Sequence, residues 1–200
     1  MTKPAFINSI RSDLSDWLIH CTQPTDVLSA FDVLRKILQE ASLIGSNQYI
    51  KAQCKCVCFS ESPLTKIKSL ITYCDTHQCS LRYAPYGIAV KKEWLFEQGG
   101  RPVIYQTDNE FSITSDEHKY RHMRYDPAKN FDFSWEREWR VNCDQLLLQP
   151  EITTVFVKSR DDIRLLLEEY YGHQSSWSLV GVPFNIDIYP WGLISLDEIS

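Results

Sequence analysis

Several features that would assign this sequence to a class at once are missing from it. Its 200 residues contain no Pro/Gly/Ser-rich stretch that would mark a linker, and no internal repeat or low-complexity segment. No apolar run is long enough to cross a membrane, and the N-terminus lacks the basic start and apolar run of a signal peptide. With 44% hydrophobic residues, we expect one cytoplasmic domain spanning residues 1–200, with no membrane partner.

Positive charge is also scarce. The net charge of -5 gives no sign of a broad electrostatic attraction to nucleic acid phosphates, so any such contact would have to be local. The densest basic cluster, residues 118–125, is interleaved with tyrosines that could stack on a base or a nicotinamide ring. Asp116 and Glu117 offset part of its charge, so a solvated loop is the alternative.

The seven cysteines do not form a metal-binding motif. They include no Cys-x2-Cys pair, and Cys54, Cys56 and Cys58 alternate along an expected strand, which is poor spacing for tetrahedral zinc. An odd number of cysteines in a chain of this size is typical of free thiols in a reducing compartment. We therefore expect free cysteines and no metal site.

Hydrophobic periodicity predicts an α+β domain with a mixed central sheet and flanking helices. Helices are expected over about 7–18, 24–44, 62–71, 92–98 and 159–170, and strands over 50–60, 86–90, 102–105, 135–141, 152–158 and 184–189. Ser159 and Asp162 fit a capping pattern at the start of the last helix. Residues 18–22 could instead open a strand. The polar stretch from Thr107 to Ser134 has weak periodicity and is long for a structureless connection, which favours a functional loop or a flap.

The run Trp135–Val141 alternates charged and large apolar residues. At the two-residue period of a strand, one face would carry Glu136, Glu138 and Arg140. Two carboxylates on a half-buried face suit charge-stabilising chemistry. The alternative is a surface strand with cross-strand ion pairs.

Three separated segments occur in the order found in ADP-ribosyltransferases. Residues 18–22 resemble the aliphatic-His-x-Thr opening of that fold, and residues 57–64 are similar to the second element of DarT-type DNA-targeting enzymes. Glu136-x-Glu138 resembles the strand that carries the catalytic glutamate. The resemblance implies an ADP-ribosyltransferase-like fold with NAD as substrate.

The overall likeness is to the AbiGi-type abortive phage resistance proteins. It covers roughly residues 18–142 and depends on the segments 58–64, 86–95, 101–105 and 136–140. It implies a role in phage defence by abortive infection, as part of a toxin–antitoxin pair. Two features depart from the family pattern: no arginine stands in a clear strand ahead of His20, and Tyr73, Tyr83 and Tyr86 compete for the position of the pocket tyrosine.

The resemblance also implies roles for individual residues. Glu138 would stabilise the oxocarbenium-like ribose of the transition state, and Glu136 would orient or deprotonate the acceptor. The residues implied in NAD binding are His20, Thr22, Phe59, Ser60, Ser62 and Arg140. The structural alternatives are a core position for His20, a helix cap for Ser62 and a simple ion pair for Arg140.

We therefore carry forward two functions. The first is an NAD-dependent ADP-ribosyltransferase that acts as a toxin or antiphage effector, and the second is a non-catalytic protein of the same fold that binds or senses a partner, or serves as an antitoxin. A metal-dependent nuclease ranks third, because its only Glu-x-Lys pair, Glu117 with Lys119, lies in a polar loop. The sequence leaves open whether the acceptor is DNA, RNA, protein or water.

Overall fold

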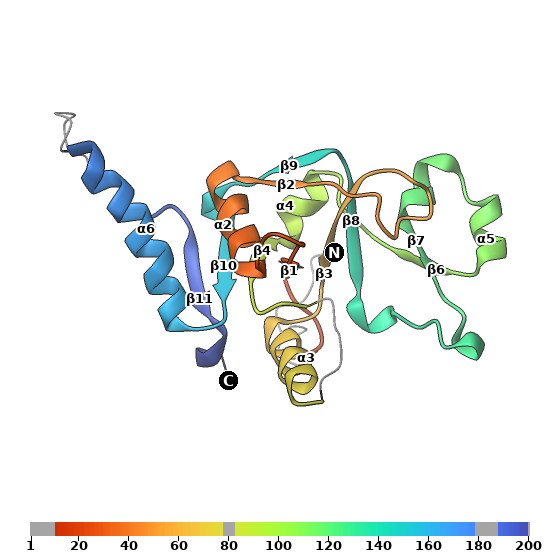
Figure 1. Cartoon of the computed structure of the whole chain (residues 1–200). Helices are drawn as coiled ribbons and strands as arrows, with labels where there is room; N and C mark the ends of the chain where they lie inside the picture. Colours follow the sequence, from red (N-terminus) through yellow and green to blue (C-terminus); the bar gives the residue numbers. More distant parts are fainter. Residues whose placement is uncertain (1–10, 78–82, 179–187, 200) are drawn as a thin grey trace.

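A seven-stranded sheet forms the centre of the protein in the computed structural model, which describes residues 11–77, 83–178 and 188–199 (Figure 1). The strands lie in the order β11-β10-β4-β1-β3-β8-β5. They are β1 (Trp17–Cys21), β3 (Cys56–Ser60), β4 (Gly87–Lys91), β5 (Arg101–Pro102), β8 (Glu138–Asn142), β10 (Thr153–Val157) and β11 (Gly192–Ser195). Within this seven-stranded sheet, β10 and β11 pair in parallel and the other described pairings are antiparallel, so the predicted mixed sheet of an α+β domain is confirmed.

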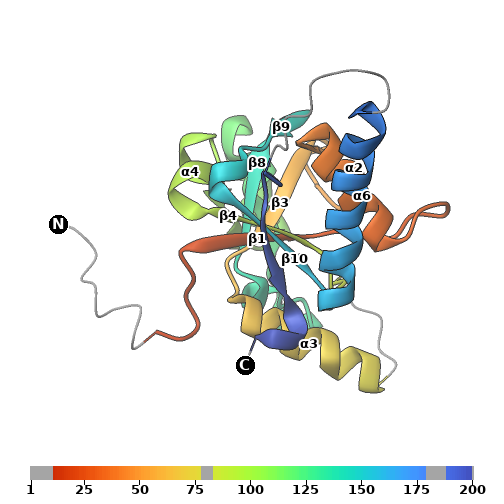
Figure 2. The same ribbon diagram turned by 90° about the vertical axis from the view of Figure 1, so that its left-hand side faces the viewer.

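Helices cover both faces of the sheet. The helices α2 (Ala30–Glu40), α4 (Lys92–Glu97) and α6 (Arg160–Ser178) pack on one side, which we call the α2 face. The helix α3 (Leu64–His77) and the 3-10 turn η5 (Leu196–Glu198) pack on the other, the α3 face (Figure 2). Successive strand residues alternate between the two: Leu18 belongs to the core under α2 and Ile19 to the core over α3.

The helix α2 begins later than predicted. Ser29 and Asp32 form a capping box, which places the first helical residue at Ala30 instead of near Pro24. Val27, which lies within the predicted helix, is 86% exposed, whereas Leu34 is fully buried. At the other end Ala41 adopts a left-handed conformation with φ 46°, which ends the helix.

The predicted first helix is wrong over its described part. Residues 11–16 form turns, and Trp17 starts β1, in agreement with the alternative that residues 18–22 open a strand. Leu18 had been placed on a helical stripe, but it pairs with Val90 of β4 and is buried on the α2 face. The backbone pairing with β4 thus overrides a pattern that fits both periods.

Other predictions succeed in part. The helices α3, α4 and α6 occur where expected, and Ser159 with Asp162 caps the start of α6. The strand predicted over 50–60 is restricted to β3, because Gln53 adopts a left-handed turn conformation with φ 58°. Two short strands were missed, β2 (Ser42–Ile44) and β9 (Gln145–Leu147), which pair with each other. The strand predicted over 184–189 falls mainly outside the described residues.

The polar stretch after Thr107 is not structureless. It forms most of a side lobe, residues 104–133, seen at the right of Figure 1. The lobe contains β6 (Ile104–Gln106), α5 (Asp108–Ile113), η1 (Asp116–Arg121), β7 (His122–Arg124) and η2 (Pro127–Lys129). Thr107 and Glu110 form a capping box at the start of α5, and β6 pairs in parallel with β7. Local capping and strand pairing therefore supply order that the weak periodicity did not indicate.

The central sheet is weakly joined between β1 and β3. Each of these strands pairs through five residues with its outer neighbour, β4 or β8, but they pair with each other only at Ile19 and Ser60. Beyond that pair, the His20 ring contacts β3 in place of the backbone, with Nδ1 at 2.8 Å from the carbonyl oxygen of Cys58. A side chain thus replaces a ladder hydrogen bond at the centre of the sheet.

Candidate functional site

Glu138 and Arg140 form a buried ion pair on β8. The distance from Arg140 Nε to Glu138 Oε1 is 2.6 Å. Arg140 is 3% exposed and Glu138 is 9% exposed. They stand two positions apart on one strand, so both point to the α3 face, as predicted. Taking two charges out of water is costly unless further hydrogen bonds satisfy them, and Arg140 also donates to the carbonyls of Tyr120 and His122.

Glu136 does not share the strand with Glu138, so the prediction of one extended strand over 135–141 is wrong at its start. Glu136 ends the 3-10 turn η3 (Ser134–Glu136), and Arg137 follows in a left-handed conformation with φ 47°. The strand begins only at Glu138. Glu136 nevertheless remains close to the site, because its carbonyl accepts a hydrogen bond from Ser60 at 2.6 Å. Burial raises the pKa of Tyr83, and the negative charge of Glu136 raises it further.

Ser60 and Ser62 fasten this turn to the end of β3. The Ser60 hydroxyl donates to the carbonyl of Glu136 at 2.6 Å, and the Ser62 hydroxyl donates to the carbonyl of Trp135 at 2.9 Å. Ser60 is also directly opposite Glu138 in the β3–β8 ladder. The two serines therefore position the backbone on which both glutamates stand.

The predicted NAD-binding residues on β1 lie next to this site but on the other face. Ile19, Ser60 and Glu138 form one row across the sheet, so His20 and Phe59 point to the α2 face, with ring centroids 5.7 Å apart. Burial lowers the pKa of His20. Two strand spacings, roughly 10 Å, separate the backbones of β1 and β8 at this level, which is within the span of one dinucleotide.

Thr22, another predicted NAD-binding residue, is buried and its hydroxyl contacts backbone carbonyls. It is 1% exposed, and its hydroxyl lies 2.8 Å from the carbonyl oxygen of Ala30 and 3.1 Å from that of Tyr86. These contacts hold the end of β1 against the start of α2. The structure thus brings together Ser60, Ser62, Glu136, Glu138 and Arg140 on the α3 face, and leaves His20, Thr22 and Phe59 outside that group.

Of the three competing tyrosines, Tyr83 is beside the carboxylates. Its ring lies 6.0 Å from that of Trp135, and its pKa is raised mainly by burial and further by the charges of Glu136 and Glu138. Tyr73 is instead exposed and stacked on His77, and Tyr86 packs on Phe31. The sequence alone did not separate them, because all three stand near strand or helix ends.

Two further residues belong to the site and were not singled out from the sequence. Burial raises the pKa of the Tyr105 phenol, whereas a hydrogen bond with the Glu138 backbone lowers it and the charge of Glu138 raises it by a smaller effect. Burial likewise raises the pKa of the Cys58 thiol, with Glu138 as the next cause. Cys58 alternates with Ser60 on β3, a two-residue spacing that could have indicated their shared face.

Glu61, between the two serines, ties neighbouring elements together. It accepts hydrogen bonds from Lys92 Nζ at 2.6 Å and from the indole nitrogen of Trp139 at 3.0 Å, and Arg137 lies 3.6 Å away. The Trp139 side chain is on the face opposite Glu138. The start of β8 is thus held from both faces of the sheet.

The expectation that every cysteine is free is wrong for Cys74, which is disulfide-bonded. The free cysteines are Cys21, Cys54, Cys56, Cys58 and Cys143. Within the described residues, no three His, Cys, Asp or Glu side chains are grouped to hold a metal ion.

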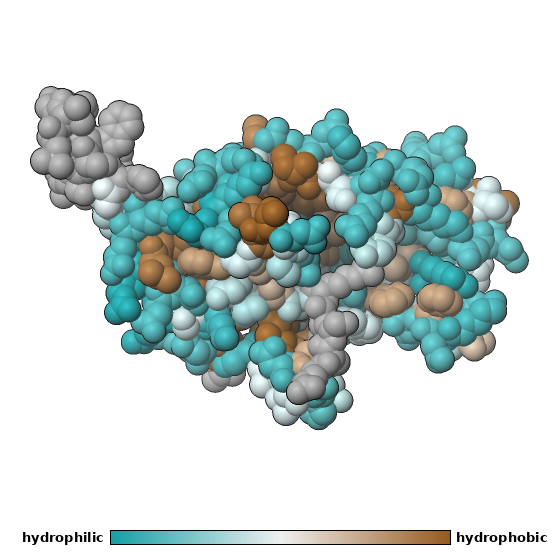
Figure 3. All heavy atoms as spheres, in the orientation of Figure 1, coloured by the Kyte–Doolittle hydropathy of each residue, from teal (hydrophilic) through white to brown (hydrophobic). Residues whose placement is uncertain are grey.

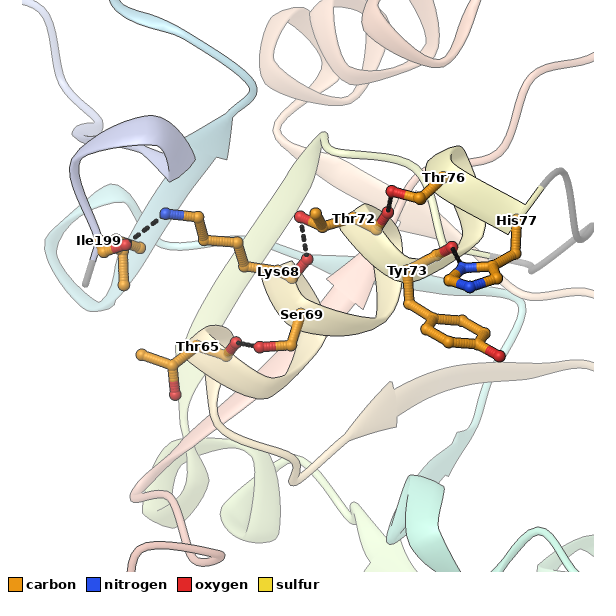
Figure 4. A pocket seen from close by; sticks show the side chains of 8 residues that line it. All are labelled: Thr65, Lys68, Ser69, Thr72, Tyr73, Thr76, His77 and Ile199. Atoms are coloured by element: carbon orange, nitrogen blue, oxygen red, sulfur yellow. Dashed lines mark hydrogen bonds between the residues drawn. The ribbon is translucent and has the colours of Figure 1, made fainter.

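Two surface pockets lie away from the carboxylates. One, of about 570 Å³, follows the outer side of α3 and is lined mainly by Thr, Ser and Lys side chains (Figure 4). Its hydroxyls from Ser69, Thr72 and Thr76 donate to backbone carbonyls one turn earlier, so they are already engaged. The other lies between α6 and η5. We do not assign the site to either pocket, because neither contains a residue of the Glu138 group.

The space-filling view shows a further hollow between α2 and β8, below β2 and β9 (Figure 3). Apolar atoms, coloured brown, gather along part of its rim. It lies in the part of the view through which β1 and β3 run.

No protein-family model, curated protein or solved structure matches this chain. In the described part of the chain, none of the helices has the length and apolar content needed to cross a membrane.

The buried ring of His122 predicts a loss of stability in acid. Burial lowers its pKa, and the nearby Lys51 lowers it further, while Asp108, at 3.8 Å, acts in the opposite direction. The imidazole of His122 therefore takes up a proton near pH 6.5 in the unfolded chain but not in the folded protein. Its contribution to the free energy of unfolding is fully present above pH 6.5 and is lost as the pH falls below that value. The slope is at most about 1.4 kcal/mol per pH unit for one proton.

Denaturant unfolding between pH 7.5 and 5.5 checks this prediction. His122→Leu should give a shallower loss of stability in acid than the wild type, since neither ring nitrogen of His122 has a hydrogen-bond partner to lose. His118→Gln, a change at an exposed histidine, serves as the control and should retain the wild-type slope. Equal slopes for the wild type and His122→Leu would contradict the assignment.

Proposed function

We propose that this protein is an NAD-dependent ADP-ribosyltransferase that acts as a toxin or antiphage effector in the cytoplasm, with Glu138 as its catalytic residue. The observation that carries the proposal is the row Ile19–Ser60–Glu138. The three segments that resemble the enzyme family are far apart in sequence, yet they occupy adjacent strands β1, β3 and β8. Their adjacency supports a common site, and through it an ADP-ribosyltransferase-like fold.

The chemistry required is the departure of nicotinamide from the ribose of NAD. The transition state has oxocarbenium character, so a carboxylate beside the ribose stabilises the developing positive charge. Glu138 suits this role because Arg140 fixes one of its oxygens at 2.6 Å in a site of low exposure. Its carboxylate would also accept a hydrogen bond from the ribose 2′-hydroxyl.

NAD would lie between the 20–22 segment, the 59–62 turn and the start of β8. Tyr83 and Trp135, with ring centroids 6.0 Å apart, would provide aromatic contact for the nicotinamide beside Glu136. His20 points to the α2 face, so it would reach the dinucleotide only at the weakly joined line between β1 and β3, and only if its ring gave up the contact with the Cys58 carbonyl.

One observation favours the alternative function. Glu138 is only 9% exposed and is already paired with Arg140, as a purely structural ion pair would be. In that case the protein would bind or sense a partner, or act as an antitoxin, without cleaving NAD.

The direct test is to incubate the purified chain with NAD and follow nicotinamide release, with and without cell lysate as a source of acceptor. We expect release by the wild type, increased by lysate if the acceptor is a macromolecule. No release under either condition would favour the non-catalytic alternative.

Glu136 is expected to act on the acceptor. Because it stands outside β8 on a turn held by Ser60, Glu136→Gln should slow transfer to the acceptor about tenfold or more while nicotinamide release changes less than about threefold. Labelled ADP-ribose on the lysate and free nicotinamide are measured in the same reaction. A parallel fall of both would assign Glu136 to NAD cleavage instead.

A further inference from the structure

We infer that the side lobe controls the position of the Glu138 carboxylate, and that Arg140 is the positioning residue that links the two. The inference rests on the proposed function, because it concerns the regulation of the same carboxylate.

One guanidinium touches both parts of the molecule. Arg140 Nε donates to Glu138 at 2.6 Å, and its NH1 nitrogen donates to the carbonyls of Tyr120 and His122, each at 2.8 Å. The Arg140 side chain is 3% exposed. Because a guanidinium is planar and its donors are fixed relative to one another, a shift of the two carbonyls reorients the bond to the carboxylate.

The carbonyls come from an ordered part of the lobe. Tyr120 is in η1 and His122 starts β7, which pairs with β6. The His122 ring is 4% exposed, with its centroid 4.6 Å from that of Phe111 in α5. The lobe is therefore packed behind the two carbonyls, so a displacement of α5 or β7 reaches Arg140 directly.

The lobe also has an outer attachment that can be altered without touching Arg140. Asp108 at the start of α5 pairs with Lys51, which lies outside the lobe, and it is 3.6 Å from Arg124 of β7. Removing the charge of Asp108 loosens this attachment and leaves Glu138 and Arg140 chemically unchanged. If Glu138 and Arg140 formed only a structural ion pair, that change would leave the position of the Glu138 carboxylate unaltered.

A kinetic cycle tests the link through nicotinamide release. Asp108→Asn should lower kcat about 3–10-fold and Arg140→Lys about tenfold or more, each with KM for NAD changed less than about twofold. The double variant should be no slower than Arg140→Lys, because the lobe then has no route to Glu138. Asp116→Asn, which removes a 93% exposed carboxylate of η1, should leave kcat unchanged. Additive losses in the double variant would overturn the inference.

Hydrogen exchange tests the link without any enzymatic reaction. Coupling is reciprocal, so Glu138→Gln should accelerate exchange of the amides of residues 116–124 about threefold or more, and Glu136→Gln should not. Unchanged exchange in Glu138→Gln would overturn the inference whatever the NAD assay gives. Faster exchange in a protein that releases no nicotinamide would support the link and reject the proposed enzyme.

Discussion

Nicotinamide release should fall about 10²-fold or more when Glu138 is replaced by glutamine, which is the scale of one lost charge-stabilising group. Glutamine keeps the volume of the side chain and still offers an oxygen to Arg140 Nε, so the change removes mainly the negative charge. The buried guanidinium loses its counter-ion, and we expect the protein to be about 1–3 kcal/mol less stable but still folded. Denaturant unfolding and nicotinamide release are measured on the same preparation.

Expression in a bacterial host provides a second measurement. If the protein is a toxin, the wild type should arrest growth, and a host should tolerate Glu138→Gln at equal protein levels. Equal tolerance of both proteins, together with equal nicotinamide release, would show that Glu138 and Arg140 form a structural pair only. Glu138→Gln must also be compared with Glu136→Gln, since only the former lies on β8.

Gly87→Ala should cause the largest loss of stability among the changes considered. A Cβ at this position would lie 2.2 Å from the carbonyl oxygen of His20 and 2.6 Å from the ring of Phe156. The first of these is backbone of β1, so the pairing of β1 with β4 must shift, and we expect a loss of about 3 kcal/mol or more. Chemical denaturation of the purified variant measures this loss.

Gly172→Ala is the matched control. Gly172 lies in α6, and a Cβ there meets nothing within 4 Å. Alanine favours the helix, so this variant should be as stable as the wild type or more stable by about 0.5–1 kcal/mol. A small effect of Gly87→Ala, comparable to that of the control, would mean that β1 and β4 can separate at little cost.

Where the sequence predicted elements correctly, the local pattern and the tertiary environment agree. β4 is a short apolar run between turn residues, and Ser159 with Asp162 marks the start of α6, so both could be predicted. Trp17 and Leu18 fit a helical stripe equally well, and only their pairing with Lys91 and Val90 decides for a strand. These pairing partners lie more than 70 residues further along the chain, so a local pattern cannot reveal them.

The site could be predicted in part for the same reason. Glu138 and Arg140 are two residues apart, so a strand period is enough to place them on one face. Glu136 fails the same argument because Arg137 takes a left-handed conformation that periodicity does not reveal. Tyr83 and Tyr105 join the group through tertiary packing alone, and the bonds from Arg140 to the Tyr120 and His122 carbonyls involve backbone, which side-chain patterns do not report.

The order of strands has a consequence for how the protein is made. Trp17 pairs with Lys91 and Phe59 with Trp139, so the central ladders join segments that leave the ribosome far apart in time. Such long-range pairing makes folding slow compared with that of a helical protein. Glu138, Arg140 and Ser60 can come together only after the segment up to residue 140 has been synthesised. A nascent chain that ends before residue 140 therefore holds no assembled Glu138–Arg140 site.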